Sequence, residues 1–187
     1  MNALIILADG FEDTEALATR DILLRGGVQV VTASIKNETS VMSSFGVKVE
    51  ADNTIYDLLE MDMLGIFDCL ILPGGGRGTQ NLKNSQEVPS IIKNFLNRNK
   101  ILAAICAAPS VYGDLGLLNG KKYTCYAGFN YNPNAIYTGT DVEVHGNFVT
   151  ARSMKYSVKF GLTLVEMLMG KEAREKVEIG IEGLNEK

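Results

Sequence analysis

The sequence contains few residues from which a metal site or a disulfide framework could be built. It has one histidine and three cysteines, Cys69, Cys106 and Cys125, which lie far apart and form no CxxC pair. Structural zinc sites need four Cys or His ligands at close spacing, and disulfide frameworks need paired cysteines. We therefore expect no metal and no disulfide, and we expect the reducing cytoplasm as the setting of this chain.

Excess basic charge and long apolar runs are also absent. The sequence has 18 Lys and Arg against 22 Asp and Glu, a net charge of -4, and no polybasic run. This argues against nucleic-acid binding, because phosphates require a basic face. No apolar stretch approaches the length of a membrane span. The apolar segment at the N-terminus is too short for a signal peptide, and the acidic Asp9 that follows it has the wrong charge. We expect neither nucleic acid nor membrane as a partner.

The sequence does have the apolar content and rhythm of an α/β protein. Its 187 residues are 46% hydrophobic, which fits a single domain spanning residues 1–187. Aliphatic runs without polar alternation are typical of strands buried on both faces of a parallel sheet. Such runs lie at residues 3–7, 28–33, 67–72 and 101–105, and helical patterns lie at 14–25 and 86–98. The order predicts a doubly wound parallel sheet sandwiched by helices.

Three later segments depart from this rhythm. Residues 41–51 and 141–151 have the short alternating pattern of hairpins, the second with His145 in its turn. Residues 153–170 predict a long amphipathic helix, with Ser153 as a possible cap and Gly170 as its end.

The most informative segment is residues 101–110, ILAAICAAPS. An apolar run with the length of a strand ends at Cys106, and the small residues and proline that follow it are typical of the start of a helix. The free amides and the dipole of a helix start favour thiolate over thiol, and so lower the pKa of a cysteine placed there. A buried core cysteine is the alternative interpretation of the same segment.

Two further strand ends carry unusual residues. The first strand is followed by an acidic turn at residues 9–15, in which Glu12 and Asp13 fit ordinary helix-start acids. The third is followed by a glycine-rich loop at residues 72–78, whose amides could form an anion nest. This loop has neither the GxxxxGK[ST] nor the GxGxxG phosphate motif. Because ligands of doubly wound sheets bind at the carboxyl ends of the strands, we expect acid, amides and thiol to converge there.

This combination resembles the ThiJ/PfpI superfamily, and within it the DJ-1-like branch of the Parkinson-disease protein deglycase. The matching segments run over the whole chain: ALIILA at 3–8, GFEDTE at 10–15, LPGG at 72–75, QNL at 80–82, AAICAAP at 103–109 and TAR at 150–152. The resemblance implies a flavodoxin-like, class I glutamine amidotransferase-like fold, no cofactor, and a homodimer that uses the first helix and the early hairpin.

The resemblance also implies roles for particular residues. Cys106 becomes the nucleophile on a strained strand-to-helix elbow, and Glu15 the acid that donates a hydrogen bond to its thiolate. Since a carboxylate beside a thiolate would be a like-charge pair, one proton must be shared and the pKa of Glu15 should rise. Gly74, Gly75 and Ala107 would supply the pocket for an oxyanion, or for the oxygens of an oxidised Cys106.

Departures from the family pattern concern the expected base. Ala107 stands where the hydrolase-like branch has a histidine, and Tyr126 where the deglycase branch commonly has one, which disfavours a Cys-His protease mechanism. Tyr126, Cys125 and Arg152 are expected at the pocket wall. Cys125 is either an accessory thiol or a packed strand-end cysteine. Arg152 pairs with an acid near the pocket or at a subunit contact, or else forms a plain surface ion pair.

Two functions follow from this interpretation. One is a cofactor-free glyoxalase or deglycase that acts on small reactive carbonyl substrates such as methylglyoxal, or on their early adducts. The other is a redox-sensing, stress-protection or chaperone-like binding protein with little turnover, in which Cys106 is oxidised. A role in thiamine biosynthesis has no support in these residues.

Overall fold

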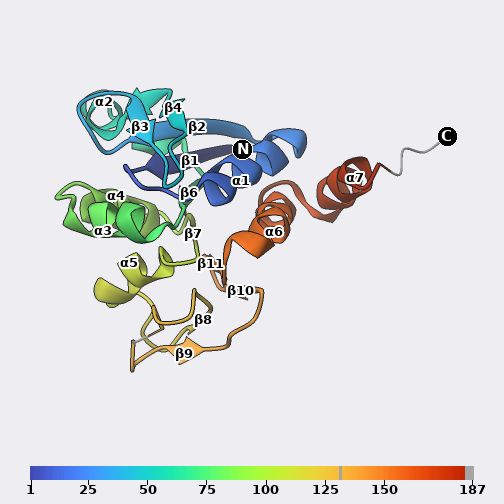
Figure 1. Ribbon diagram of the computed structural model, residues 1–187. Helices are drawn as coiled ribbons and strands as arrows, with labels where there is room; N and C mark the ends of the chain where they lie inside the picture. Colours follow the sequence, from blue (N-terminus) through green and yellow to red (C-terminus); the bar gives the residue numbers. More distant parts are fainter. Residues whose placement is uncertain (131, 184–187) are drawn as a thin grey trace.

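The centre of the molecule is one seven-stranded sheet, seen in a computed structural model that describes residues 1–130 and 132–183 (Figure 1). The strand order is β10-β11-β7-β6-β1-β2-β5, and all neighbours are parallel except β10 and β11. The strands are β1 (Asn2–Leu7), β2 (Gln29–Ser34), β5 (Asn53–Thr54), β6 (Cys69–Leu72), β7 (Ile101–Ile105), β10 (Val142–His145) and β11 (Phe148–Ala151).

Two pairs of short strands lie outside this sheet. β3 (Ser40–Met42) and β4 (Lys48–Glu50) form an antiparallel hairpin, and β8 (Lys122–Tyr123) pairs in parallel with β9 (Ile136–Tyr137). The hairpin is attached to the end of β1 through hydrogen bonds from Gly10 N–H to Met42 and from Ser44 N–H to Phe11.

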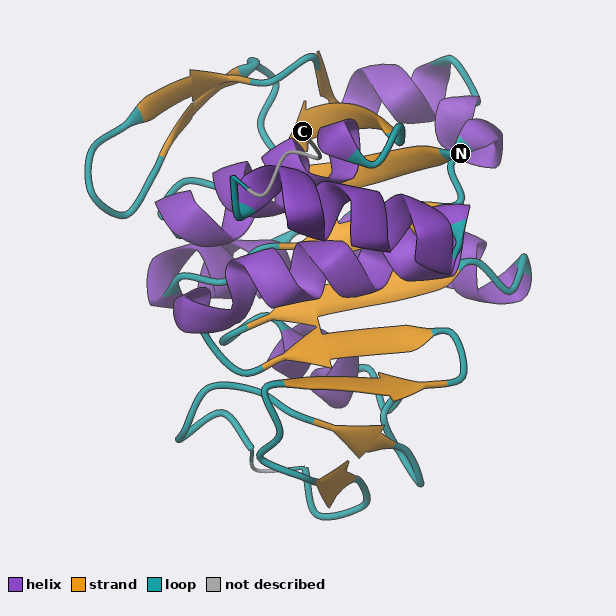
Figure 2. Cartoon of the chain, turned by 90° about the vertical axis from the view of Figure 1, so that its right-hand side faces the viewer, coloured by secondary structure: helices purple, strands orange, loops and turns teal. Residues whose placement is uncertain are grey.

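Helices cover both faces of the sheet and bury a separate apolar core on each (Figures 1 and 2). One face carries α1 (Asp13–Arg25), α6 (Ser157–Met169) and α7 (Lys171–Ile181), and Figure 2 looks onto this face. The other carries α2 (Ile55–Glu60), α3 (Gly76–Asn84), α4 (Val88–Asn97) and α5 (Pro109–Asp114). The predicted doubly wound α/β architecture is confirmed.

Several predicted boundaries are corrected. The single helix expected over 153–170 is divided into a 3-10 turn, Met154–Tyr156, and α6. The Ser153 side chain caps neither of them. Gly170 ends α6, as expected, with a positive φ. The glycine-rich loop is short, because α3 already begins at Gly76. Both hairpins are present, and the second joins the main sheet through β11.

Three helices were not expected from the sequence. They are α2, α3 and α7. The capping box of α2, in which Thr54 and Asp57 bond reciprocally, is a signal that the sequence contained. No helix in the described part of the chain has the length and apolar character needed to cross a bilayer.

The sheet register brings four chain segments to one edge. Ile5 lies beside Ile71, Leu72 beside Ala104, and Ile105 beside Ala151. β1, β6, β7 and β11 therefore end close together, and the residues that follow them meet above the carboxyl edge of the sheet.

The contact between α1 and α6 can be tested at Gly161. A Cβ built there would lie 2.8 Å from Cβ of Ile22, so Gly161→Ala should lower the free energy of unfolding by about 1–3 kcal/mol. Gly180→Ala in α7 is the matched control. Its Cβ would meet nothing within 4 Å, and the gain in helix propensity should stabilise the protein by about 0.5–1 kcal/mol. Urea unfolding measures both changes, and equal stabilisation by the two would contradict this packing.

Candidate active site

Cys106 occupies a sharp corner of the backbone immediately after β7. Its φ is +63°, a left-handed conformation that non-glycine residues adopt at a cost of about 1–3 kcal/mol. Two hydrogen bonds hold the corner: Cys106 N–H donates to the Ala151 carbonyl at 2.9 Å, and Tyr126 N–H donates to the Cys106 carbonyl at 2.8 Å. The strand-to-helix elbow expected from the resemblance is therefore present, supported by β11 on one side and the 124–126 segment on the other.

The Glu15 carboxyl lies against this corner. Glu15 sits in the first turn of α1, and its side chain is completely buried. Gly74 N–H donates to Oε2 at 2.8 Å, and the carboxyl is also hydrogen bonded to the Cys106 thiol. Oε1 is buried and has no hydrogen-bond partner in the described part of the chain. Because Oε2 accepts from Gly74, Oε1 is the oxygen that is free to carry a proton.

The approach of these groups depends on a missing side chain at Gly74. A Cβ there would lie 2.6 Å from Glu15 Oε2 and 2.8 Å from the Cβ of Cys106. Any other residue would separate the carboxyl from the thiol. The LPGG motif thus contributes a close approach as well as amide donors.

The pKa of Glu15 is raised to about 7, mainly by burial and to a smaller extent by the neighbouring charge of Glu12. The hydrogen bonds from Cys106 and Gly74 act in the opposite direction but are smaller. The rise in the Glu15 pKa agrees with the prediction. A proton can therefore remain on this carboxyl near neutral pH.

The expected fall in the pKa of Cys106 is not found. Burial raises the pKa of this thiol, and an ionised Glu15 raises it further by charge and by its hydrogen bond, while the amides of Ala107 and Gly75 lower it. The helix-dipole argument is weak here because α5 starts three residues later, at Pro109, and is only 6 residues long. With Glu15 protonated, the two contributions of its charge disappear and its O–H donates to sulfur. The thiolate therefore requires a neutral Glu15.

Two of the three residues expected at an anion pocket present backbone amides to Cys106. The backbone amides of Gly75 and Ala107 are within hydrogen-bonding reach of the Cys106 sulfur. Gly74 is a correction, because its N–H is committed to Glu15 Oε2 and is not available to an oxyanion. In the structure, Gly74 therefore positions the Glu15 carboxyl through its backbone N–H.

Glu12 has a role that the sequence interpretation missed. Its carboxylate accepts from Glu15 N–H at 2.7 Å, capping α1, and its own N–H donates to the Gly74 carbonyl at 3.0 Å. Glu12 thus joins the helix that carries the acid to the loop that fixes it. Its position at a helix start was visible in the sequence, but the contact with Gly74 was not.

Tyr126 and Cys125 flank the corner differently from what was expected. The Tyr126 backbone holds Cys106, while its side chain is half exposed. The Cys125 side chain is fully buried in the core beneath α4 and α5, whereas Cys106 packs against the opposite core. Burial raises the pKa of Cys125 to about 12. Cys125 is therefore placed as a packed strand-end cysteine, and Cys69 is likewise buried in the core.

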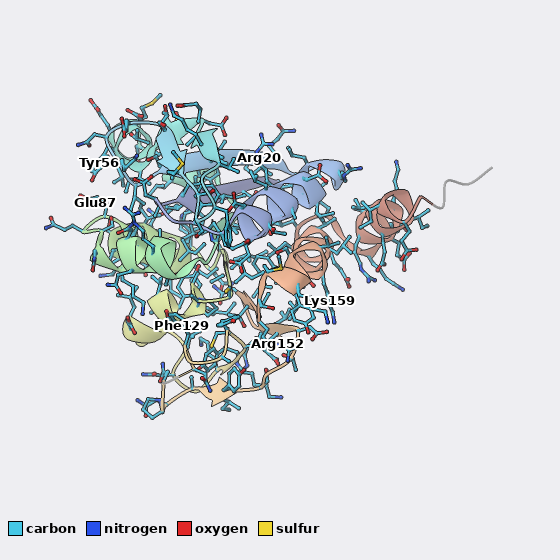
Figure 3. The ribbon with its side chains drawn as sticks, viewed as in Figure 1. Arg20, Tyr56, Glu87, Phe129, Arg152 and Lys159 are labelled. Atoms are coloured by element: carbon cyan, nitrogen blue, oxygen red, sulfur yellow. The ribbon has the colours of Figure 1, made fainter. Side chains whose placement is uncertain are left out.

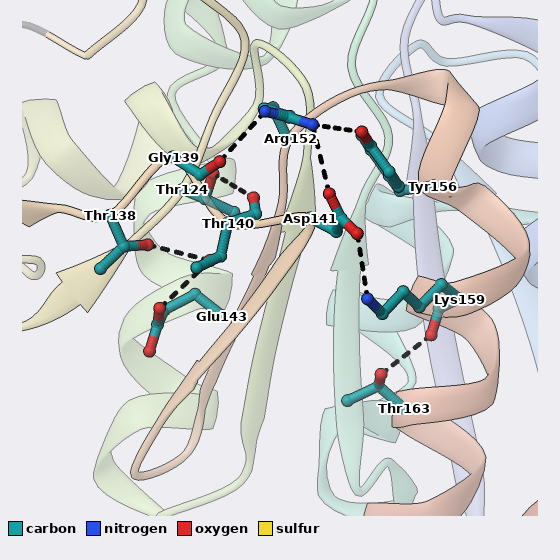
Figure 4. A network of polar contacts seen from close by, with 10 residues as sticks. All are labelled: Thr124, Thr138, Gly139, Thr140, Asp141, Glu143, Arg152, Tyr156, Lys159 and Thr163. Carbon is teal, nitrogen blue, oxygen red and sulfur yellow. Dashed lines mark hydrogen bonds and ion pairs between the residues drawn. The ribbon is translucent and has the colours of Figure 1, made fainter.

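Arg152 follows directly after Ala151, the residue that binds Cys106 N–H. Its guanidinium donates to the Gly139 carbonyl at 3.1 Å, to Asp141 Oδ1 at 3.2 Å and to the Tyr156 hydroxyl (Figure 4). Asp141 also binds Lys159 at 3.0 Å. Arg152 thus pairs with an acid, as expected, and it fastens the 139–141 segment to the end of β11 and the start of α6.

The fold and this corner define a class: flavodoxin-like proteins that present a cysteine where a central strand turns toward a helix. The model of the DJ-1/PfpI family matches residues 1–167, and the chain belongs to that family. The family includes cysteine-nucleophile enzymes such as proteases and deglycases.

Individual relatives support this assignment. The Parkinson disease protein 7 homolog of Danio rerio is 33% identical over 180 residues, covering 94% of each chain. Protein DJ-1 homolog B of Arabidopsis thaliana is 38% identical over 177 residues, 93% of this chain but 40% of that protein. The chain spans less than half the length of the two Arabidopsis relatives. The solved Toxoplasma gondii DJ-1, in an oxidized form, superposes with a TM-score of 0.90 at 31% identity, covering 96% of this chain and 97% of that one.

The buried carboxyl makes stability depend on pH. The folded state binds the Glu15 proton more tightly than the unfolded chain, so stability should fall as pH rises from 4.5 to about 7. Glu15→Gln keeps the shape without the charge. Its stability relative to wild type should therefore rise by about 3 kcal/mol across this range.

Urea unfolding at a series of pH values measures this difference. Glu172→Gln, at an exposed position of α7, is the control, and its difference from wild type should stay flat. If the stability difference between Glu15→Gln and wild type also did not change with pH, the pKa of Glu15 would not be raised in the folded protein.

Proposed function

We propose that this protein is a cofactor-free, cysteine-dependent glyoxalase or deglycase that acts on small reactive carbonyl compounds such as methylglyoxal or their early adducts. The observation that carries the proposal is the Cys106 thiol on its left-handed corner, hydrogen bonded to a buried Glu15 whose pKa lies near neutrality. A nucleophile beside an acid that can both give and take a proton at neutral pH suits addition to an aldehyde.

The geometry supports the following sequence with methylglyoxal. The Cys106 thiolate adds to the aldehyde carbon, and the resulting oxyanion is received by the amides of Gly75 and Ala107 and takes a proton from Glu15. The Glu15 carboxylate then takes the proton from the former aldehyde carbon, and the ketone carbon gains one, which gives a thioester of lactate. Water hydrolyses the thioester, releasing lactate and the thiol. No external oxidant or reductant is consumed.

A second candidate function rests on the same two amides. Because they lie near the sulfur, they can also donate to oxygen atoms placed on it, and a partly exposed thiolate is the form that peroxide attacks. The oxidized form of the Toxoplasma gondii relative adds support. In this alternative the protein responds to oxidation, or protects other molecules under stress, with little turnover.

The resemblance also implies a homodimer, and exposed apolar residues support it. Leu17 and Leu24 are exposed on α1, and Phe45 and Val47 on the tip of the β3–β4 hairpin. These are the two elements expected at the contact.

The enzymatic proposal is tested by lactate formation from methylglyoxal. Cys106→Ser and Glu15→Ala should each lower kcat/KM by about 100-fold or more, because one removes the nucleophile and the other the proton carrier. Cys125→Ala removes a thiol from the opposite core and should stay near wild type. Equal rates in all four proteins would rule out catalysis at this site.

The redox alternative is tested by intact-mass analysis after mild peroxide treatment. The wild type should gain two oxygen atoms on Cys106, while Cys69 and Cys125 stay unmodified because both are buried. Cys106→Ala should gain none. Oxidation spread over all three cysteines, or absent, would contradict selective oxidation at the corner.

A further inference from the structure

A separate polar cavity lies at the same edge of the sheet, on the other side of a backbone contact. Its volume is about 510 Å³, within the range of small-molecule sites. Its lining includes Asp9, Lys36, Tyr56, Arg77, Asn81 and Glu87, and excludes Cys106 and Glu15. The backbone of Gly10, which packs on Arg77, is in close contact with that of Gly75, where a Cβ would lie 2.3 Å from the Gly10 carbonyl.

The cavity is located where doubly wound sheets bind ligands. Asp9 follows β1, Lys36 follows β2 and Arg77 lies in the first turn of α3, after β6. β2 and β6 flank β1 on opposite sides, so the chain order reverses at this point of the sheet. Crevices outside the carboxyl ends of strands at such a reversal are preferred binding sites.

The acid at the back of the cavity is already satisfied. Asp9 Oδ1 accepts from Met42 N–H at 2.9 Å, and Oδ2 accepts from Lys36 Nζ at 3.3 Å. Lys36 also binds Glu38 at 2.9 Å. These contacts, led by the Met42 amide and then Lys36, outweigh burial and lower the pKa of Asp9. A cationic ligand would therefore find the Asp9 carboxylate already paired.

The guanidinium of Arg77, unlike the carboxylate of Asp9, has no partner among the described residues. Among residues 1–130 and 132–183, its guanidinium has neither an ion pair nor a hydrogen bond, and Asp9 acts on it only at longer range. Its stem is nevertheless fixed, because it packs on Gly10, where a Cβ would lie 2.6 Å from the Arg77 Cβ. A positioned guanidinium with free donors is suited to bind a carboxylate or a phosphate.

The remaining lining is polar and mostly neutral. Asn81 donates its amide to the Asp9 carbonyl at 2.7 Å, which fixes the side chain and leaves its oxygen available. Tyr56 and Glu87 lie together on the α2 and α4 side of the molecule, where the Tyr56 hydroxyl bonds the Glu87 carboxylate (Figure 3). Amide and hydroxyl groups of this kind pair well with ligand hydroxyls.

We propose that this cavity is a second binding site, separate from Cys106, for a small organic anion that carries hydroxyl groups, such as a sugar phosphate or a sugar acid. The anionic group binds Arg77, and the hydroxyls bind Asn81 and its polar neighbours. Binding is noncovalent and does not use the thiol.

Calorimetric titration tests the proposal with three probes: a hexose phosphate, the matching sugar acid and the uncharged hexose. At least one of the two anions should bind, and the uncharged hexose should bind about tenfold more weakly or worse. Tight binding of the phosphate alone, or of the acid alone, identifies which anionic group Arg77 takes. Equal binding of all three, or binding of none, would overturn the proposal.

The variant Arg77→Gln tests whether the anion binds at this cavity. Arg25→Gln, which removes the same charge from an exposed position on α1, is the matched control. The first should weaken anion binding by about tenfold or more, and the second should leave it unchanged. Iodoacetamide modification of Cys106 should be the same in both variants, which shows that the corner is intact. Anion binding that survives Arg77→Gln but is lost in Cys106→Ser would place the ligand at the thiol and refute a second site. Neither result depends on whether the protein turns over methylglyoxal.

Discussion

The contact between the Glu15 carboxyl and the Cys106 thiol is the constraint on which the rest of this structure depends. Two acids in a buried place share a single hydrogen bond, and both cannot be ionised there without a large electrostatic cost. A carboxyl pKa near 7 means that an ionised Glu15 costs the fold about 3 kcal/mol, a substantial part of the 5–15 kcal/mol typical of a domain. The chain therefore keeps a proton between these groups, and its location decides whether the sulfur can react.

The surrounding backbone holds this costly arrangement in place. Gly74 gives the carboxyl room and one donor, and Glu12 ties the start of α1 to the same loop. On the other side, Ala151 and Tyr126 bind both backbone groups of Cys106 and keep its left-handed conformation. Since these contacts come from five separate segments that meet only at the sheet edge, the strain at Cys106 can persist only in the folded protein.

Much of this could be predicted from the sequence, and the failures have physical causes. Uninterrupted aliphatic runs predicted the four central strands, and the run ending at Cys106 predicted the thiol at the sheet edge. Glu15 came from the family resemblance, because an acid in a first helical turn has the same pattern whether it is buried or solvated. The prediction of a lowered thiol pKa was wrong mainly because Cys106 is largely buried beside Glu15, and also because α5 is short and starts late; periodicity reveals neither. The cavity at Arg77 was not predicted because it depends on α3. The three glycines at 74–76 favoured a loop in the sequence, whereas the helix begins at Gly76.

Because the single histidine of the sequence, His145, is not at this corner, the proposed mechanism assigns proton transfer to Glu15. Tyr126, at the position where the resemblance led us to expect a histidine, contributes its backbone to Cys106, and its side chain is half exposed. His145 lies in β10, where its Nδ1 accepts a hydrogen bond from the Lys122 N–H of β8. A carboxyl with a pKa near 7 can replace a histidine in this respect, since it exchanges protons in the same pH range. Aldehyde addition and peroxide oxidation would then draw on the same state, a thiolate beside a protonated Glu15, and the local supply of carbonyl and peroxide would decide between them.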